Sequence, residues 1–289
     1  MLKTNNSVRI LMKINYTSAC LLCLFASFSS LAEQAIPETS QATTIKRYSV
    51  KEARQAVAVD GQAFYAINNQ TIVKMDKNTG RELARWQGEK EGPLSHLDSG
   101  VVFDGKLYAA HTNYPQWPMT SSVEIWDTAT LAHVSSYSFG IDRGSLTWID
   151  RDANGVWWGT FANYNRVFGK SSSVYGNKYN TQLVRFDDKW QVQESWVFPD
   201  ALIDLFDDMS NSGGSWGKDG KLYITGHDNP AIYVLEIPKM GSVLNWVNTI
   251  KADISGQGIA YDRSVENKII YGIVRRDNSE SEITVNQLE

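Results

Sequence analysis

The sequence predicts an all-β protein, and three observations favour a five-bladed β-propeller. First, the chain after residue 43 shows almost none of the 3.6-residue apolar periodicity of an amphipathic helix. Second, short apolar strands alternate with turns rich in Asp and Gly. Third, this pattern recurs about every 45 residues with four strands per unit, which is typical of propeller blades. We therefore expect one domain over 44–289.

A tight turn joins the first two strands of each unit. It contains an Asp-Gly pair at 60–61, 104–105 and 219–220, and the variant 152–155 reads Asp-Ala-Asn-Gly. Glycine adopts positive φ at little cost, so these pairs favour tight turns. The inner strands of the five units are expected to begin near Val57, Gly100, Ser145, Gly214 and Gly258.

The last unit is one strand short, and the other end of the chain supplies a strand without a unit. Strands are expected at 258–261, 268–274 and 282–288, where the chain ends, and at 44–50. We expect the N-terminal strand to close the ring as the outer strand of the last blade, because this removes an exposed sheet edge. A six-bladed ring and a β-sandwich are the alternatives. No whole blade is found within 160–212, and a sandwich does not explain the repeat.

The N-terminus predicts export. Lys3, Arg9 and Lys13 precede ten largely apolar residues at 19–28, and Ser30-Leu31-Ala32 follows as a cleavage pattern. These features indicate a signal peptide over 1–32 and then a flexible leader over 33–43. The apolar run is too short for a stable membrane span. We expect a periplasmic or secreted protein, with translation starting at Met1 or Met12.

Composition narrows the classes of function. The net charge is −4, and removal of the signal peptide leaves 25 basic against 32 acidic residues. The chain has no dominant basic run, which argues against nucleic-acid binding. Both cysteines, Cys20 and Cys23, lie in the signal peptide, so the exported chain has neither a disulfide nor a thiolate nucleophile. No haem, flavin or nucleotide motif is found, so we expect no organic cofactor, and we expect a monomer.

Two sequence elements resemble known propeller families. Residues 104–108 and 219–223 read Asp-Gly-Lys-Leu-Tyr, and residues 76–80 read Asp-Lys-Asn-Thr-Gly. Across about 45–289 the chain resembles exported propellers of the quinoprotein-like and YVTN-like groups, and also the five-bladed glutaminyl cyclotransferase propellers. The resemblance implies the fold and an exported location. It implies no activity, because no catalytic motif of these families matches particular residues here.

The fold sorts the loops onto two faces. In a propeller blade, the link into the first strand lies on the same face as the loop between the second and third strands. Binding sites on rigid scaffolds are commonly built from such loops. We therefore predict a ligand site in the central funnel of this face, with turn formation and simple hydration as the alternative. The polar candidates on it are His96, Asp98, His111, Asn113, Arg143, Asn163, Tyr164, His227, Asp228, Gln257 and Arg275.

Roles follow from residue type. Histidine exchanges protons near neutral pH, so the pairs His227/Asp228 and His96/Asp98 are predicted to perform acid–base catalysis. The other residues of this face are predicted to bind ligand, together with Trp216 as a stacking platform. Arg143 and Arg275 favour a small polar anion. Lyase, isomerase, cyclotransferase and hydrolase chemistry stay open, as does a non-catalytic propeller that recognises a peptide, a glycan or a protein partner.

A divalent metal is an alternative with weaker support. His96, His111 and His227 are of the residue type that binds zinc, but no local metal-binding motif accompanies them. A calcium site is a second alternative because hard oxygen ligands suit this ion. Its ligands would be the carboxylates of a segment that also fits a solvated short helix, namely Asp200, Asp204, Asp207 and Asp208.

Overall fold

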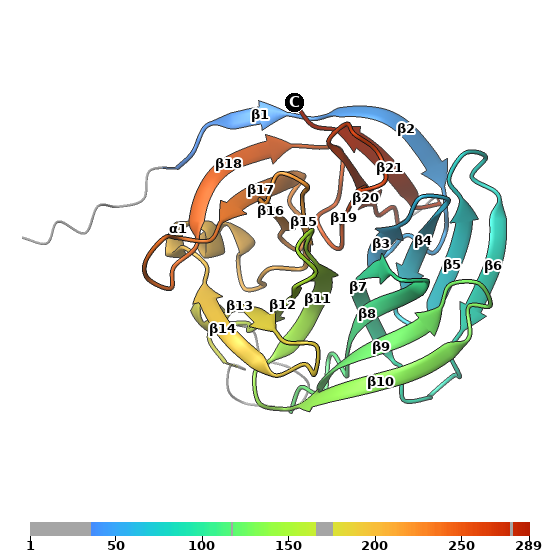
Figure 1. Cartoon of the computed structure of the whole chain (residues 1–289), viewed down its shortest axis with the longest axis horizontal. Coiled ribbons are helices and arrows are strands. Elements are labelled where there is room, and N and C mark those ends of the chain that lie inside the picture. Colours follow the sequence, from blue (N-terminus) through green and yellow to red (C-terminus); the bar gives the residue numbers. More distant parts are fainter. Residues whose placement is uncertain (1–35, 117, 166–175, 278–279) are drawn as a thin grey trace, which may run out of the picture. The chain divides into compact units, whose positions relative to one another are not determined.

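The computed structural model describes residues 36–116, 118–165, 176–277 and 280–289. Every described residue lies in one compact unit, Gln34–Glu289. The predicted signal peptide over 1–32 lies outside the described residues. In this unit, five sheets surround a central axis and form a β-propeller (Figure 1). None of the described helices is long and apolar enough to cross a membrane.

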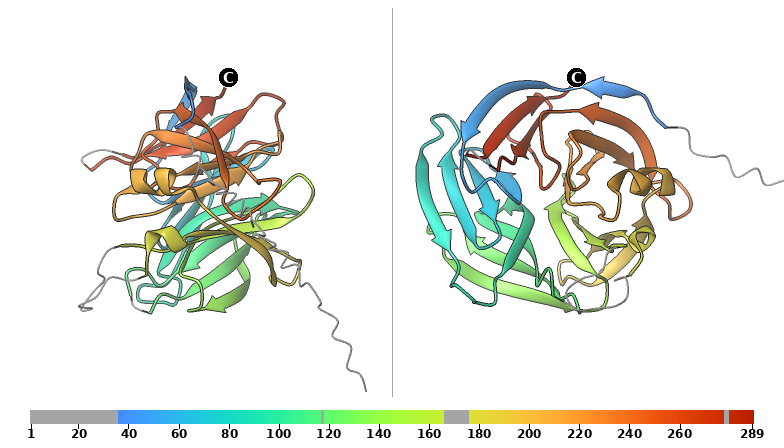
Figure 2. Two further views of the ribbon diagram at one scale, coloured as in Figure 1. Left: turned by 90° about the vertical axis from the view of Figure 1, so that its left-hand side faces the viewer. Right: turned by 180° about the vertical axis from the view of Figure 1, so that it is seen from behind.

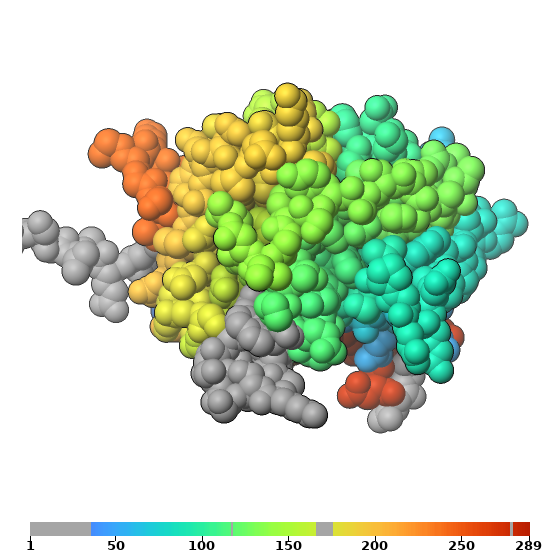
Figure 3. Space-filling model, turned by 90° about the horizontal axis from the view of Figure 1, so that it is seen from below, coloured from blue at the N-terminus to red at the C-terminus, as the bar shows by residue number. Residues whose placement is uncertain are grey.

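The first three blades follow the chain from the inner to the outer strand, and their neighbouring strands pair antiparallel. Blade 1 comprises β3 (Ala56–Val59), β4 (Ala63–Asn68), β5 (Thr71–Asp76) and β6 (Glu82–Gln87). Blade 2 comprises β7 (His96–Phe103), β8 (Lys106–Thr112), β9 (Ser121–Asp127) and β10 (His133–Gly140). Blade 3 comprises β11 (Ser145–Arg151), β12 (Trp157–Ala162), β13 (Gln182–Phe186) and β14 (Val192–Val197). The outer surfaces of blades 2 and 3 lie side by side (Figure 3).

The N-terminal strands belong to the last two blades. Blade 4 comprises β15 (Gly213–Trp216), β16 (Leu222–Thr225), β17 (Ala231–Glu236) and β18 (Asn245–Lys251). Blade 5 comprises β19 (Ala260–Tyr261), β20 (Ile269–Val274) and β21 (Glu282–Gln287), and β2 (Thr43–Ser49) pairs antiparallel with β21 as its outer strand. The expected flexible leader is wrong for β1 (Thr39–Gln41), because this strand pairs parallel with β18. Both strands follow the outer edge of the ring (Figure 2).

Short helices precede blade 4. The helix α1 (Asp200–Ile203) continues into the 3-10 turn η2 (Asp204–Phe206), as the sequence predicts for this segment. A second 3-10 turn, η1 (Lys178–Asn180), precedes β13. Leu202, Ile203 and Phe206 are buried in the core between blades 3 and 4, so this segment is anchored by apolar packing.

The first two strands of each blade are largely buried on both faces because blades pack face to face. Successive side chains of a strand point to opposite faces. Along β4, Phe64 packs in the cluster shared with blade 5, and Tyr65 packs in the cluster shared with blade 2. The outer strand β6 is exposed at alternate positions. The core is therefore a ring of apolar layers between blades, and the strands around the axis are buried between these layers.

Gly258 lies where the inner ends of blades 5, 1 and 2 meet. A Cβ atom at this position would lie 2.3 Å from Ala56 Cβ and 2.8 Å from Ser99 Oγ. We expect Gly258→Ala to lower the free energy of unfolding by about 1–3 kcal/mol through overpacking. Gly61→Ala is the matched control, because its added Cβ would meet only Ser264 Cβ at 3.8 Å. Urea unfolding of both variants checks this, and equal stability of the two would contradict it.

Candidate active site

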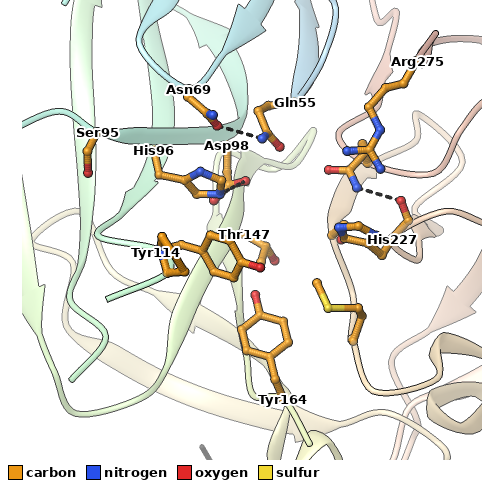
Figure 4. Close-up of a pocket in the computed structure, with 14 residues that line it drawn as sticks. Gln55, Asn69, Ser95, His96, Asp98, Tyr114, Thr147, Tyr164, His227 and Arg275 are labelled. Atoms are coloured by element: carbon orange, nitrogen blue, oxygen red, sulfur yellow. Dashed lines mark hydrogen bonds and ion pairs between the residues drawn. The ribbon is translucent and has the colours of Figure 1, made fainter. Parts of the chain in front are cut away.

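A polar cavity of about 320 Å³ lies on the face that holds the links into the inner strands and the loops between second and third strands. All five blades contribute to it (Figure 4). His96 and Asp98 face His227 and Arg275 across the cavity (Figure 4). The lining residues are Gln55, Asn69, Ser95, His96, Asp98, Tyr114, Pro115, Thr147, Tyr164, Met209, Ser212, His227, Gln257 and Arg275.

One side of the cavity holds an oriented imidazole. His227 follows β16, and its Nδ1 pairs with Asp228 Oδ2. The other oxygen of Asp228 accepts a hydrogen bond of 2.6 Å from Arg275 Nη2. Gln257 Nε2 donates to the backbone oxygen of His227 at 2.7 Å. The Asp228 contact orients the ring, and the Gln257 contact fixes the backbone of residue 227, so Nε2 is the ring nitrogen left for proton exchange with a ligand.

The charge state of Asp228 supports this orientation. Partial burial acts to raise the pKa of Asp228, but the hydrogen bonds and charges of His227 and Arg275 outweigh it and hold the pKa below its usual value. Asp228 is therefore ionised at neutral pH. An ionised carboxylate accepts only, so it favours the imidazole tautomer that carries its proton on Nδ1.

The opposite side holds a buried carboxyl beside a second histidine. Asp98 is only 8% exposed, and its Oδ1 lies 3.6 Å from His96 Nε2. Burial raises the pKa of Asp98 well above its usual value. Burial also lowers the pKa of His96 to about 4, with smaller contributions from the charges of His111 and His227. Burial thus favours the neutral forms of both groups.

Two β-bulges turn side chains into the cavity. The register of β7 against β8 shifts between Leu97 and Gly100, at Asp98 and Ser99. The register of β11 against β12 shifts between Leu146 and Trp148, at Thr147. A bulge places one extra residue in a strand and re-aims its side chain, often beside an active site. Thr147 was missed by sequence reasoning, because a bulge leaves no pattern in the residue types.

Sequence analysis also missed the contribution of blade 1, although the sorting of loops onto two faces predicts it. Gln55 directly precedes β3 and so lies in the link into the first strand. Asn69 lies in the turn between β4 and β5, the second and third strands, which is on the same face. Gln55 Nε2 donates to Asn69 Oδ1 at 2.7 Å. The candidates named from the sequence come from the links and loops of the other four units, so these two positions of the first unit were not considered.

Aromatic rings form one wall of the cavity. The ring of His96 lies against Tyr114 at a centroid distance of 4.9 Å and an angle of 31°. Tyr164 meets Tyr114 edge-on, at 6.5 Å and 66°. Tyr164 was predicted to bind ligand, and it lines the cavity beside these two residues.

His111 and Asn113 lie outside the cavity lining and support the scaffold instead. His111 is buried, its Nε2 accepts the Ser95 N–H at 3.2 Å, and its Nδ1 lies 2.9 Å from Ser122 Oγ. Asn113 Oδ1 accepts the Thr120 N–H at 2.7 Å and so closes its own loop. Their placement in the ligand site is corrected, because their polar atoms are engaged within blade 2.

Arg143, Asn163 and Trp216 are also placed elsewhere. Arg143 and Asn163 line a separate, more open hollow of about 660 Å³, so the expectation that Arg143 shares the cavity with His227 is wrong. Trp216 is 4% exposed and packs against Trp158 at 4.8 Å in the core of blades 3 and 4. It lies at the far end of β15, and burial excludes it as a stacking platform.

The geometry offers little to a metal ion. Among the described residues, no group of three or more His, Cys, Asp or Glu side chains is placed to hold one. Both ring nitrogens of His111 are engaged within the scaffold. Asp204, a candidate for calcium, accepts a hydrogen bond from Tyr179 Oη and lies 3.5 Å from Lys178 Nζ.

The buried histidine His111 predicts a loss of stability in acid. Burial lowers its pKa to about 4. Between pH 6.5 and 4 the unfolded chain binds a proton that the folded chain rejects, so stability falls as pH falls. His111→Gln removes this contribution. Between pH 7 and pH 5, the free energy of unfolding of the native protein should fall by about 2 kcal/mol more than that of the variant, as measured by urea unfolding. Equal losses in the two proteins would contradict the buried, neutral state of His111.

Comparison with known proteins shows the fold. The chain matches no known protein family and no curated protein. A GH43_1 enzyme from Xanthomonas citri is similar in structure at a TM-score of 0.55 and 10% identity, over 86% of this chain and 91% of that one. A calcium-binding protein, regucalcin, from Agrobacterium tumefaciens gives a TM-score of 0.52 and 10% identity, over 87% and 97%. A PQQ-bound aldose sugar dehydrogenase from Streptomyces coelicolor gives a TM-score of 0.49 and 10% identity, over 88% of this chain and 100% of that one. The five sheets and the first two of these similarities confirm the predicted propeller fold, and at these identities the similarity extends to the fold alone.

Proposed function

We propose that the central cavity is an active site for general acid–base chemistry on a small polar ligand. The observation that carries the proposal is the pair His227–Asp228 facing the buried carboxyl of Asp98 across one cavity of about 320 Å³. Burial raises the pKa of Asp98, whereas the pKa of Asp228 is held below its usual value. Carboxyl groups whose environments push their pKa values apart are typical of acid–base sites. The cavity volume lies at the lower end of the range for small-molecule sites.

The two sides of the cavity perform different steps. His227 takes a proton from the ligand at Nε2, and the ionised Asp228 stabilises the imidazolium that forms. Arg275 positions Asp228. Asp98, in its protonated form, donates a proton to the ligand from the opposite side. Proton removal and proton delivery at separate atoms suit a lyase, an isomerase, a cyclotransferase or a hydrolase.

A thermal-shift screen of small polar compounds tests the proposal. We expect at least one compound to raise the melting temperature of the native protein, and to be converted on incubation. His227→Ala should slow conversion by about 10²–10⁴-fold, whereas Arg143→Gln, in the separate hollow, should keep the native rate. Binding without conversion would favour the alternative of a non-catalytic propeller that recognises a peptide, a glycan or a protein partner. A panel that gives no shift at all would contradict a small-ligand site.

We also propose that the protein is exported to the periplasm or secreted. The predicted signal peptide supports this, because its positive charges, apolar run and small-residue cleavage pattern occur in the required order. The mature protein should begin near Glu33 and contain no thiol, since Cys20 and Cys23 are removed. Intact mass and thiol titration of the protein from the exported fraction check this. Two reactive thiols in that fraction would contradict it.

A further inference from the structure

We propose that the cavity takes a neutral, hydroxyl-rich ligand of about the size of one sugar ring, and not an anion. This inference rests on the proposed function and names the ligand class of the same site. It differs from the sequence-based expectation of an anionic ligand, which depended on Arg143 and Arg275. Arg143 lines a different hollow, so the charge balance of the cavity depends on Arg275 and its neighbours.

The charges around the cavity cancel. Arg275 is the one Arg or Lys among the described lining residues, and it bonds to the ionised Asp228 at 2.6 Å. Burial holds the pKa of His96 at about 4, so this ring is uncharged at neutral pH. An anion would compete with Asp228 for Arg275. It would also lie near Asp98, the one carboxyl among the described lining residues, whose burial already disfavours a negative charge. Among the lining residues that the structure describes, no Arg or Lys is left unpaired to compensate for this cost.

The hydrogen-bonding groups suit hydroxyls. The amides of Gln55, Asn69 and Gln257 and the hydroxyls of Thr147 and Ser212 line the cavity. Amides and hydroxyls both donate and accept hydrogen bonds, and so does each hydroxyl of a sugar or polyol. A ligand with several adjacent hydroxyls can therefore form hydrogen bonds with groups from four blades without carrying charge.

The aromatic wall suits the apolar face of a ring. His96 and Tyr114 lie at 31° to one another, and Tyr164 meets Tyr114 edge-on. Aromatic rings present large apolar area with polar tips. The C–H face of a sugar ring matches such a wall, while its hydroxyls reach the amides on the other sides of the cavity. The volume of about 320 Å³ is enough for one sugar ring.

A matched panel tests the inference. Each of several neutral monosaccharides and polyols (glucose, galactose, mannose, xylose, arabinose, inositol) is compared with its uronic acid and amino sugar where these exist, by thermal shift and calorimetric titration at pH 7. We expect at least one neutral compound to bind, and its uronate to bind at least tenfold more weakly. Uronates that bind as tightly as the neutral sugars would overturn the inference and leave the acid–base site standing. No binding by any neutral compound would also overturn it.

A variant that removes the charge of Asp228 tests whether its ion pair with Arg275 sets the preference for a neutral ligand. Asp228→Asn keeps a hydrogen-bond acceptor for His227 but leaves Arg275 without its ion-pair partner. We expect this variant to shift the preference toward the uronate by at least tenfold relative to the native protein. Arg143→Gln is the matched control and should leave the ratio unchanged, because Arg143 lies outside the cavity. An unchanged ratio in Asp228→Asn would show that the paired Arg275 does not set the preference.

Discussion

His227→Ala is expected to lower kcat by about 10²–10⁴-fold while leaving the melting temperature within a degree or two of the native value. A positioned general base contributes about this much to a rate. The side chain lies in a loop at the cavity wall, and its substitution removes little apolar packing. The backbone oxygen of residue 227, which accepts the Gln257 hydrogen bond, persists in the variant. Steady-state kinetics on the compound identified by thermal shift, with a melting curve for each variant, measures both effects.

Asp228→Asn provides the graded comparison. It keeps His227 in place but removes the charge that stabilises the imidazolium, so we expect kcat to fall less than in His227→Ala. Asn163→Ala, in the separate hollow, is the control and should keep native kinetics. A His227→Ala protein with native kcat would exclude this residue as the base.

Sequence reasoning predicted the architecture well because the repeat is carried by local chemistry. Asp-Gly turns at 60–61, 104–105 and 219–220 mark three of the hairpins, and the unpaired strand at 44–50 predicts the pairing that β2 makes with β21. The sorting of loops onto two faces depends only on strand order, and it places His96, Asp98 and His227 on the face where they line one cavity. Their catalytic roles stay predictions.

The site residues that were placed incorrectly depend on side-chain direction, which strand order does not specify. Arg143 and Asn163 lie on the predicted face but line a neighbouring hollow. His111 lies at the end of β8, where its ring turns into blade 2 and bonds to the Ser95 backbone. Thr147 reaches the cavity through a bulge that depends on register against β12. Such details arise from packing between strands far apart in the sequence.

Removal of residues 44–50 is expected to have the largest effect on stability. Strand β2 pairs along its length with β21, and Tyr48 is buried against Phe64 at a centroid distance of 4.6 Å. Loss of one buried aromatic side chain costs about 3–5 kcal/mol, and the whole free energy of unfolding of a domain is about 5–15 kcal/mol. The deletion also exposes the edge of β21, which favours aggregation. Circular dichroism melting and size-exclusion chromatography should show an unfolded or aggregated protein.

Two point variants keep this prediction specific. Tyr48→Ala should cost about 3–5 kcal/mol with the strand still present. Ile45→Ser, on the same strand but 53% exposed, should change stability by less than about 0.5 kcal/mol. A deleted protein that melts within a degree or two of the intact chain would show that β2 does not close the ring.

The central claim is that one cavity, built from all five blades, binds the ligand. The most direct test is the Kd of the compound that raises the melting temperature most, measured by calorimetric titration for variants on three different blades. We predict at least tenfold weaker binding for Asn69→Ala, His96→Ala and Arg275→Gln, and a Kd within twofold of native for Arg143→Gln. Native affinity in the three cavity variants, with loss of binding in Arg143→Gln, would contradict the account and place the site in the neighbouring hollow.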